Sequence, residues 1–106
     1  MSGRKVFLSP RAEADLDALA DWIAENGSPI TALDYIARIR RYISGFDKFP
    51  ERGRRHDTIK RGLRAVSFER RVTITFVVRR KWVEVERVFY GGRNWRRVRG
   101  TTRVDD

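Results

Sequence analysis

The sequence predicts an α+β domain in which an antiparallel sheet packs against an N-terminal helix hairpin. Apolar residues recur at helical spacing in the first half of the chain and at every second position in the second half. These are the spacings of a helix with one buried face and of a half-buried strand, so the change of period separates helices from strands. A short β-like segment at residues 4–8 precedes the helices. The expected order is therefore β-α-α-β-β-β.

Both expected helices begin at a Ser-Pro pair. Ser9-Pro10 and Ser28-Pro29 each place a hydroxyl at the N-cap and a proline at the first helical position. We expect the first helix to end at Gly27, in the left-handed conformation that glycine tolerates. A link this short predicts an antiparallel helix hairpin. The faces expected to be buried carry Ala12, Leu16, Leu19, Ala20 and Ile23 on the first helix, and Ala32, Ile36, Ile39, Ile43 and Phe46 on the second.

The second half of the chain predicts a meander of three antiparallel strands after a polar, basic loop at residues 51–60. Strands are expected at residues 63–68, at residues 72–78 and from Trp82 onward. The basic residues 79–81 between the last two strands predict a tight hairpin turn.

The last strand contains a break in its alternation of apolar and polar residues. Val83 and Val85 share one phase with Phe89, whereas Tyr90 is in the other phase. Either the strand is buried on both faces near its end, or a β-bulge lies near residues 86–87.

Three residues capable of binding lie together where this strand ends. Tyr90 precedes a double glycine, and Arg93 and Trp95 follow it. Arginine and aromatic residues are enriched at the centres of binding interfaces, so we expect the function to lie here. The full set of expected binding residues is Arg64, Arg71, Arg87, Tyr90, Arg93 and Trp95.

The composition sets limits on the class of protein. A chain of 106 residues fits one domain, which we expect at residues 1–95. Residues 96–106 would then form a basic C-terminal tail, either flexible or ordered. The sequence has no cysteine and one histidine, His56, which argues against a metal site or a thiol nucleophile. It shows no secretion signal and no apolar run of membrane-spanning length, so a cytoplasmic protein is expected.

The net charge of the protein lies in the second half of the chain. Residues 1–50 hold seven basic and seven acidic residues, whereas residues 51–106 hold 17 basic and seven acidic ones. All of the +10 net charge therefore belongs to the second half. Such a field favours an acidic partner, either nucleic acid or an acidic protein segment, although a solubilising surface has the same composition.

Several short motifs follow one another in a fixed order between Val6 and about Trp95. They are Leu8-Ser9-Pro10 with Ala12, Glu13 and Leu16, the helix hairpin, Phe49-Pro50 with Gly53, Gly62-Leu63-Arg64, the strand Val72–Phe76, and the segment Arg87–Arg93. In this order and at these spacings, the motifs resemble the RelE/ParE superfamily of bacterial toxins, and the ParE branch fits best.

The resemblance implies a toxin without a cofactor that inhibits DNA gyrase by binding and is neutralised by a ParD-like antitoxin with an acidic C-terminal segment. The alternative within the superfamily is a RelE-like endoribonuclease that cuts messenger RNA on the ribosome. ParE-like chains commonly have histidine before the Gly-x-Arg of the last strand, where this sequence has Tyr90. A tyrosine near the end of the sheet is a feature of RelE-like nucleases.

A metal-free ribonuclease needs a general base, a general acid and cations for the phosphorane. The residues for that role would be Arg64, Tyr90 and Arg93, with Glu51 or His56 as further proton carriers. Tyrosine has a pKa near ~10 and needs a large depression to act as a base. The sequence therefore favours a protein that binds rather than catalyses. A plain nucleic-acid-binding module is a third reading, which the charge permits.

Purely structural roles are equally compatible with these residues. Arg64 and Arg87 could pair with Glu84 and Glu86, and Tyr90 could pack at the sheet edge with its hydroxyl in water.

Overall fold

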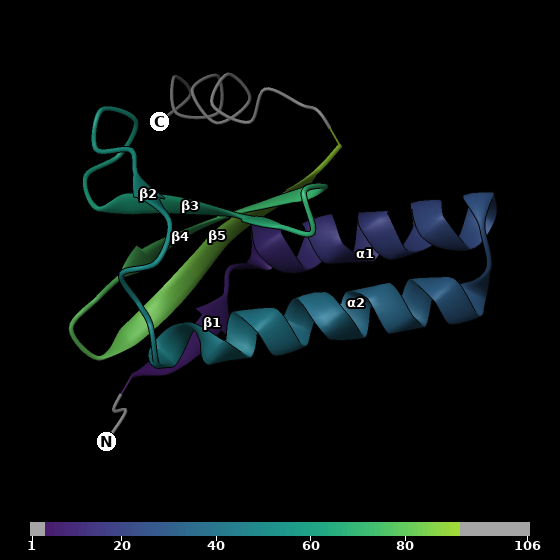
Figure 1. Ribbon diagram of the computed structural model, residues 1–106, viewed down its shortest axis with the longest axis horizontal. Coiled ribbons are helices and arrows are strands. Elements are labelled where there is room, and N and C mark those ends of the chain that lie inside the picture. Colours follow the sequence, from purple (N-terminus) through teal and green to yellow (C-terminus); the bar gives the residue numbers. More distant parts are fainter. Residues whose placement is uncertain (1–3, 92–106) are drawn as a thin grey trace.

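The computed structural model describes residues 4–91, and Figure 1 shows its helices and strands. The elements are β1 (Lys5–Leu8), α1 (Pro10–Asn26), α2 (Pro29–Ser44), the 3-10 helix η1 (Gly45–Asp47), β2 (Arg54–Arg55), β3 (Leu63–Phe68), β4 (Val72–Val78) and β5 (Trp82–Tyr90). The predicted α+β class and element order are confirmed. The segment expected to be only a loop contains the additional two-residue strand β2.

The two helices begin as the Ser-Pro pairs predict. The Ser9 hydroxyl accepts a hydrogen bond from the Ala12 backbone N–H at 3.0 Å, and the Ser28 hydroxyl accepts one from Thr31 at 3.1 Å. Each cap satisfies a backbone donor that the first helical turn leaves free. The helices run antiparallel beside each other, and their linked ends project beyond the sheet (Figure 1).

Gly27 ends α1 without the left-handed conformation that the sequence predicts. Its φ is −137° and its ψ is −104°, and its N–H donates to the Ile23 carbonyl at 2.7 Å. Only Gly27 and Ser28 separate the two helices, and Ser28 is already the extended N-cap of α2. Gly27 must therefore reverse the chain as well as close the last turn of α1.

The sheet has the strand order β1-β5-β4-β3-β2. The meander β3-β4-β5 is antiparallel as expected, but β1 pairs in parallel with the first half of β5, so the whole sheet is mixed. Leu8 lies opposite Val85, which is the last residue of this parallel pairing. Among the described strands, β5 is therefore central at its start and an edge strand from Glu86 onward.

The main core lies between the helices and one face of the sheet. Phe46 of η1 and Phe76 of β4 are fully buried, with ring centroids 4.6 Å apart. Both helices bury the faces that the sequence marks, although Ala20 and Ile36 are only partly covered. A smaller cluster on the opposite face of the sheet consists of Leu63, Val77 and Phe89.

The slip of pattern in β5 is a β-bulge, and the strand is also buried on both faces. Thr75 lies opposite Arg87 while Phe76 lies opposite Val85, so Glu86 is an extra residue on β5. The bulge returns Val88 to the helix side of the sheet, and it places Phe89 on the other side. Both readings that the sequence left open are therefore correct.

Candidate functional site

The bulge in β5 is held by the first turns of α1. The Asp15 carboxylate accepts hydrogen bonds from Arg87 Nε at 2.8 Å, from Arg87 Nη2 at 3.0 Å and from the Val88 backbone N–H at 2.8 Å. The side chains of Arg87 and Asp15 are only 12% and 17% exposed. The Ser9 hydroxyl also donates to the Glu86 carbonyl, at 2.8 Å. Each of these bonds joins the start of α1 to the irregular part of β5.

Arg87 thus has a partner inside the protein. Its guanidinium is shared by Asp15 and by the ring of Phe89, whose centroid lies 4.8 Å from Arg87 Cζ. A bidentate pair of this kind fixes the orientation of the guanidinium. The sequence considered glutamates of the sheet as partners for Arg87, whereas the structure supplies an aspartate from a helix 72 residues away. A contact of Arg87 with another protein stays a prediction.

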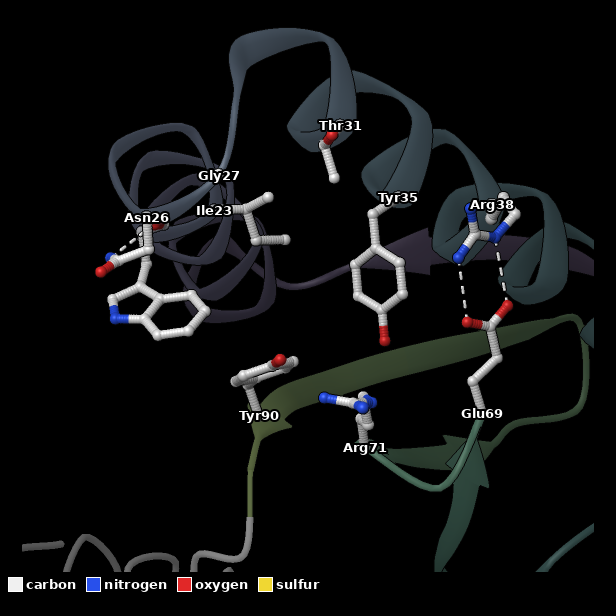
Figure 2. A pocket seen from close by; sticks show the side chains of 10 residues that line it. Ile23, Asn26, Gly27, Thr31, Tyr35, Arg38, Glu69, Arg71 and Tyr90 are labelled. Carbon is white, nitrogen blue, oxygen red and sulfur yellow. Dashed lines mark hydrogen bonds and ion pairs between the residues drawn. The ribbon is translucent and has the colours of Figure 1, made fainter.

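Tyr90 lies between two hollows at the end of β5. Its ring packs against Trp22 of α1 with centroids 5.5 Å apart, and Trp22 is 50% exposed. The smaller hollow, about 230 Å³, lies towards Asp15 and Leu19. The larger hollow, a cleft of about 330 Å³, lies between the two helices and the turn that joins β3 to β4. The residues lining this cleft are Trp22, Ile23, Asn26, Gly27, Thr31, Tyr35, Arg38, Glu69, Arg71 and Tyr90 (Figure 2).

One rim of the cleft is closed by an ion pair. Arg38 donates to both carboxylate oxygens of Glu69, at 3.1 and 3.0 Å, and it also pairs with Asp34. Glu69 is held in place by a two-residue turn, because Glu69 and Arg70 have φ values of 51° and 62° without any glycine. Positive φ at both central residues matches the twist of a tight β-hairpin, at some cost in backbone strain.

The inner wall of the cleft contains two polar groups that lack partners among residues 4–91. The Tyr35 hydroxyl is buried and forms no hydrogen bond with this part of the chain. Figure 2 shows it pointing towards the space between Tyr90 and Arg71. The guanidinium of Arg71 forms no hydrogen bond or ion pair with any residue in the described part of the chain. The backbone carbonyl of Arg71 accepts a hydrogen bond from the Gly91 N–H at 2.8 Å. Burial, followed by the nearby Glu69 charge, raises the pKa of Tyr35, so its hydroxyl keeps its proton.

Arg64 is also part of an internal contact. Its Nη1 donates to the Glu51 carbonyl at 2.8 Å, which ties the loop before β2 to strand β3. It lies opposite Phe76 on β4, whereas Tyr90 lies opposite Val72. Four residues of a strand span roughly 13 Å, so Arg64 and Tyr90 do not form one cluster. The sequence also allowed Arg64 to pair with Glu84 or Glu86 on a neighbouring strand, but β4 lies between β3 and β5.

The other residues singled out by the sequence lie away from this site or outside the structure. His56 lies in the turn before β3, where its backbone N–H donates to the Leu63 carbonyl at 2.8 Å. Arg93, Trp95 and the tail at residues 96–106 lie outside the described residues. In residues 4–91 no cluster of three His, Cys, Asp or Glu side chains could hold a metal ion, and no helix is long and apolar enough to cross a membrane.

The helix hairpin has an apolar groove on its outer side that the sequence analysis missed. The groove has a volume of about 510 Å³ and lies between α1 and α2, with alanines of both helices and Leu33 in its walls. Leu33 and its neighbour Ile30 are 73% and 79% exposed. The signal was available in the sequence, because Ile30, Leu33 and Ala37 form a second apolar line at helical spacing on α2.

Comparison with known proteins identifies the family of this protein. A family model described as the ParE toxin of the type II toxin–antitoxin system parDE matches residues 6–95. The chain belongs to the ParE toxin family. A search of curated proteins finds no match.

A solved structure agrees with this family at the level of the fold. The chain is similar to a structure titled as the chromosomal ParDE TA system from P. aeruginosa, with a TM-score of 0.75 and 22% identity. The match covers 86% of this chain and 99% of the other. This ParE-family chain therefore shares its fold with that structure, and on a shared fold particular side chains decide the function.

Proposed function

We propose that this ParE-family toxin inhibits DNA gyrase in the cytoplasm by binding to it, and that a ParD-like antitoxin neutralises the toxin. The observation that carries the proposal is the match of the ParE toxin model to residues 6–95. The target and the antitoxin are inferred from that family. The binding residues proposed from the sequence include Arg93 and Trp95, together with the described residues around Tyr90.

The surface of the toxin supports a partner that is both apolar and acidic. Leu33 and Ile30 expose apolar area beside the groove of the helix hairpin, and an amphipathic helix could cover them. The +10 net charge of the second half of the chain would attract carboxylates on the same partner. A disordered antitoxin segment can reach both surfaces, because it orders as it binds.

The geometry gives little support to the alternative of a ribonuclease. Of the residues expected to form its active site, Arg64 is bonded to the loop before β2, and Tyr90 packs on Trp22 at a different part of the sheet. Proton transfer requires donor and acceptor within hydrogen-bond reach of the reacting atoms. The separation of Arg64 from Tyr90 therefore favours a toxin that acts by binding.

Tyr90→Phe separates the two mechanisms. The ring and its packing on Trp22 are retained, and only the hydroxyl is lost. A toxin that binds gyrase should keep its potency to within about 1 kcal/mol, the value of one hydrogen bond. A nuclease that uses this hydroxyl for proton transfer should lose on the order of a hundredfold in rate. The measurements are supercoiling by purified gyrase and cleavage of messenger RNA on translating ribosomes.

Inhibited supercoiling with intact messenger RNA is the result we expect for both the wild type and Tyr90→Phe. Messenger cleavage by the wild type that Tyr90→Phe abolishes would overturn the proposal and assign the protein to the nuclease branch. Trp22→Phe is a useful companion variant, since it keeps an aromatic ring against Tyr90 without touching the hydroxyl.

A further inference from the structure

We propose that the cleft between Tyr35, Arg71 and Tyr90 receives an aspartate or glutamate side chain of the antitoxin. The inference rests on the proposed function, because it assumes an acidic protein partner. It adds a defined site and two toxin residues that would recognise the carboxylate.

The two polar groups in the cleft are hydrogen-bond donors, so a ligand that binds them must supply a hydrogen-bond acceptor. Arginine has five N–H donors and no acceptor, and the protonated Tyr35 hydroxyl has a hydrogen to donate. Neither side chain has a hydrogen-bond partner within residues 4–91, and the Tyr35 hydroxyl is buried. A buried polar group without a partner destabilises the folded protein. A carboxylate oxygen between Tyr35 and Arg71 would give both groups an acceptor and form charge-assisted hydrogen bonds.

The charge of the cleft suits a single negative group. Among the residues that line it, the positive charge of Arg38 is engaged by Glu69 and also by Asp34 just outside. Arg71 is the cation left over, so the lining carries a net charge of one positive unit from Arg38, Glu69 and Arg71. One carboxylate would neutralise it.

The same features argue against a nucleic-acid phosphate. Binding to a nucleic-acid backbone needs several cations in a row. Here Glu69 lines the cleft together with Arg71, and Asp34 pairs with Arg38 at its rim, so both carboxylates would repel a longer polyanion. The remaining walls are mostly apolar, with Trp22 and Ile23 contributing on one side. An acidic side chain on an amphipathic protein segment matches both properties.

The size of the cleft fits side chains rather than a cofactor. Its volume of about 330 Å³ is at the lower end of the range for small-molecule sites. The cleft also opens beside the exposed ring of Trp22, so a bound segment would change the environment of that indole. Trp22 is therefore expected to be covered in the complex.

The experiment measures the affinity of the full-length toxin for the antitoxin encoded beside its gene. Arg71→Gln should weaken binding by about tenfold or more, since it removes the charge that faces the carboxylate. Arg80→Gln is the matched control, because it makes the same charge change in the turn between β4 and β5. The control should change affinity by no more than about threefold, the effect of the general field.

Tyr35→Phe separates a role in binding from a merely structural role, because the two roles predict different changes in affinity and in melting temperature. It should weaken the complex by about threefold to tenfold. The melting temperature of the free toxin should stay the same or rise, because the removed hydroxyl has no partner among residues 4–91. A clear fall in the melting temperature of the free toxin with unchanged affinity would overturn the role given to Tyr35.

The carboxylate itself is found by changing each Asp or Glu of the antitoxin's C-terminal segment to Asn or Gln. One of these changes should cost about tenfold against the wild-type toxin and less than about twofold against Arg71→Gln, because the two side chains form one interaction. If the antitoxin binds but Arg71→Gln equals Arg80→Gln, or no carboxylate couples to Arg71, the inference is wrong and the proposed function stands.

Two further outcomes would count against the cleft as a carboxylate site. A labelled single-stranded oligonucleotide that binds the toxin, and loses more affinity than the antitoxin does in Arg71→Gln, would assign Arg71 to phosphate binding. An antitoxin that does not bind the wild-type toxin at all would overturn the proposed function and this inference together.

Discussion

The bulge of β5 and the cleft beside Tyr90 lie a few residues apart on the same strand, but their polar groups differ in whether they have hydrogen-bond partners in the described part of the chain. At the bulge, Asp15 accepts three hydrogen bonds from Arg87 and Val88. In the cleft, the Tyr35 hydroxyl and the Arg71 guanidinium have no partner among residues 4–91. Paired groups of the first kind hold elements together, whereas unpaired groups of the second kind are available to another molecule.

The difference follows from the side chain that α1 presents to each part of β5. The extra residue Glu86 disturbs the strand ladder, and the first turns of α1 lie close enough for Asp15 to supply the missing acceptor. Beyond Val88 the strand continues towards the far end of the hairpin. There α1 presents Trp22, an aromatic ring, which can pack on Tyr90 but cannot satisfy a cation.

Asp15→Ala should have the largest effect on stability. It leaves the largely buried guanidinium of Arg87 and the N–H of Val88 without their acceptor, which is expected to cost about 2 to 4 kcal/mol. For a domain of this size the melting temperature should fall by roughly 10 to 20 °C. Thermal unfolding followed by circular dichroism measures it.

Asp17→Asn is the control for this change, because Asp17 is an exposed carboxylate on the same helix. It should leave the free energy of unfolding within about 0.5 kcal/mol of the wild type. An equal loss in both variants would mean that the charge of α1, rather than the bond to the bulge, stabilises the protein.

The features that the sequence predicted are those set by neighbouring residues. The caps at Ser9 and Ser28 depend on the next three residues, and the bulge at Glu86 appears as a slip of phase within one strand. The parallel pairing of β1 with β5 was missed because the whole helix hairpin lies between them in the chain. Alternation of residues shows that a segment is a strand but does not show its partner or its direction.

The site was predicted less completely than the fold. Tyr90 and Arg71 were singled out as residue types, but their grouping with Tyr35 and Trp22 depends on how the helices cross the end of the sheet. Arg87 was singled out for the same reason as Arg71, since both are arginines near the last strands. Only the three-dimensional structure shows that Arg87 is paired with Asp15.

Tyr35→Phe should change how stability depends on alkaline pH. Burial raises the pKa of the Tyr35 phenol above its ordinary value of 10.0, so the folded protein resists losing this proton. The contribution of this phenol to stability is therefore fully present below about pH 10, and it is lost as the pH rises through the raised pKa. Urea unfolding at about pH 9 and about pH 11 should show a larger loss in the wild type than in Tyr35→Phe.

Tyr42→Phe is a matched variant for this measurement, because it removes a hydroxyl from the same helix at a position outside the cleft. If the wild type and Tyr35→Phe lose the same stability between the two pH values, the phenol is not desolvated and the cleft is wetter than the structure shows.

Glu13→Gln should have the smallest effect, and it tests whether pairing alone separates the two regions. Arg40 donates to Glu13 at 2.8 and 3.3 Å, which joins α2 to α1, but the two side chains are 44% and 45% exposed. The Arg40 hydrogen bond holds the pKa of Glu13 below its usual 4.5, with burial acting in the opposite direction. Solvent screening should limit the value of this pair to a few tenths of a kcal/mol.

Because the folded pKa of Glu13 is lowered, the pair contributes its full stability above about pH 4.5 and loses it as the pH falls through the lowered value. Urea midpoints of the wild type and Glu13→Gln should therefore differ slightly at about pH 7, and this difference should shrink as the pH falls below about 4.5. A loss as large as that of Asp15→Ala would show that burial is not what distinguishes the bond at the bulge. The small loss that we expect would mean that a paired carboxylate stabilises this fold strongly only where water is kept out.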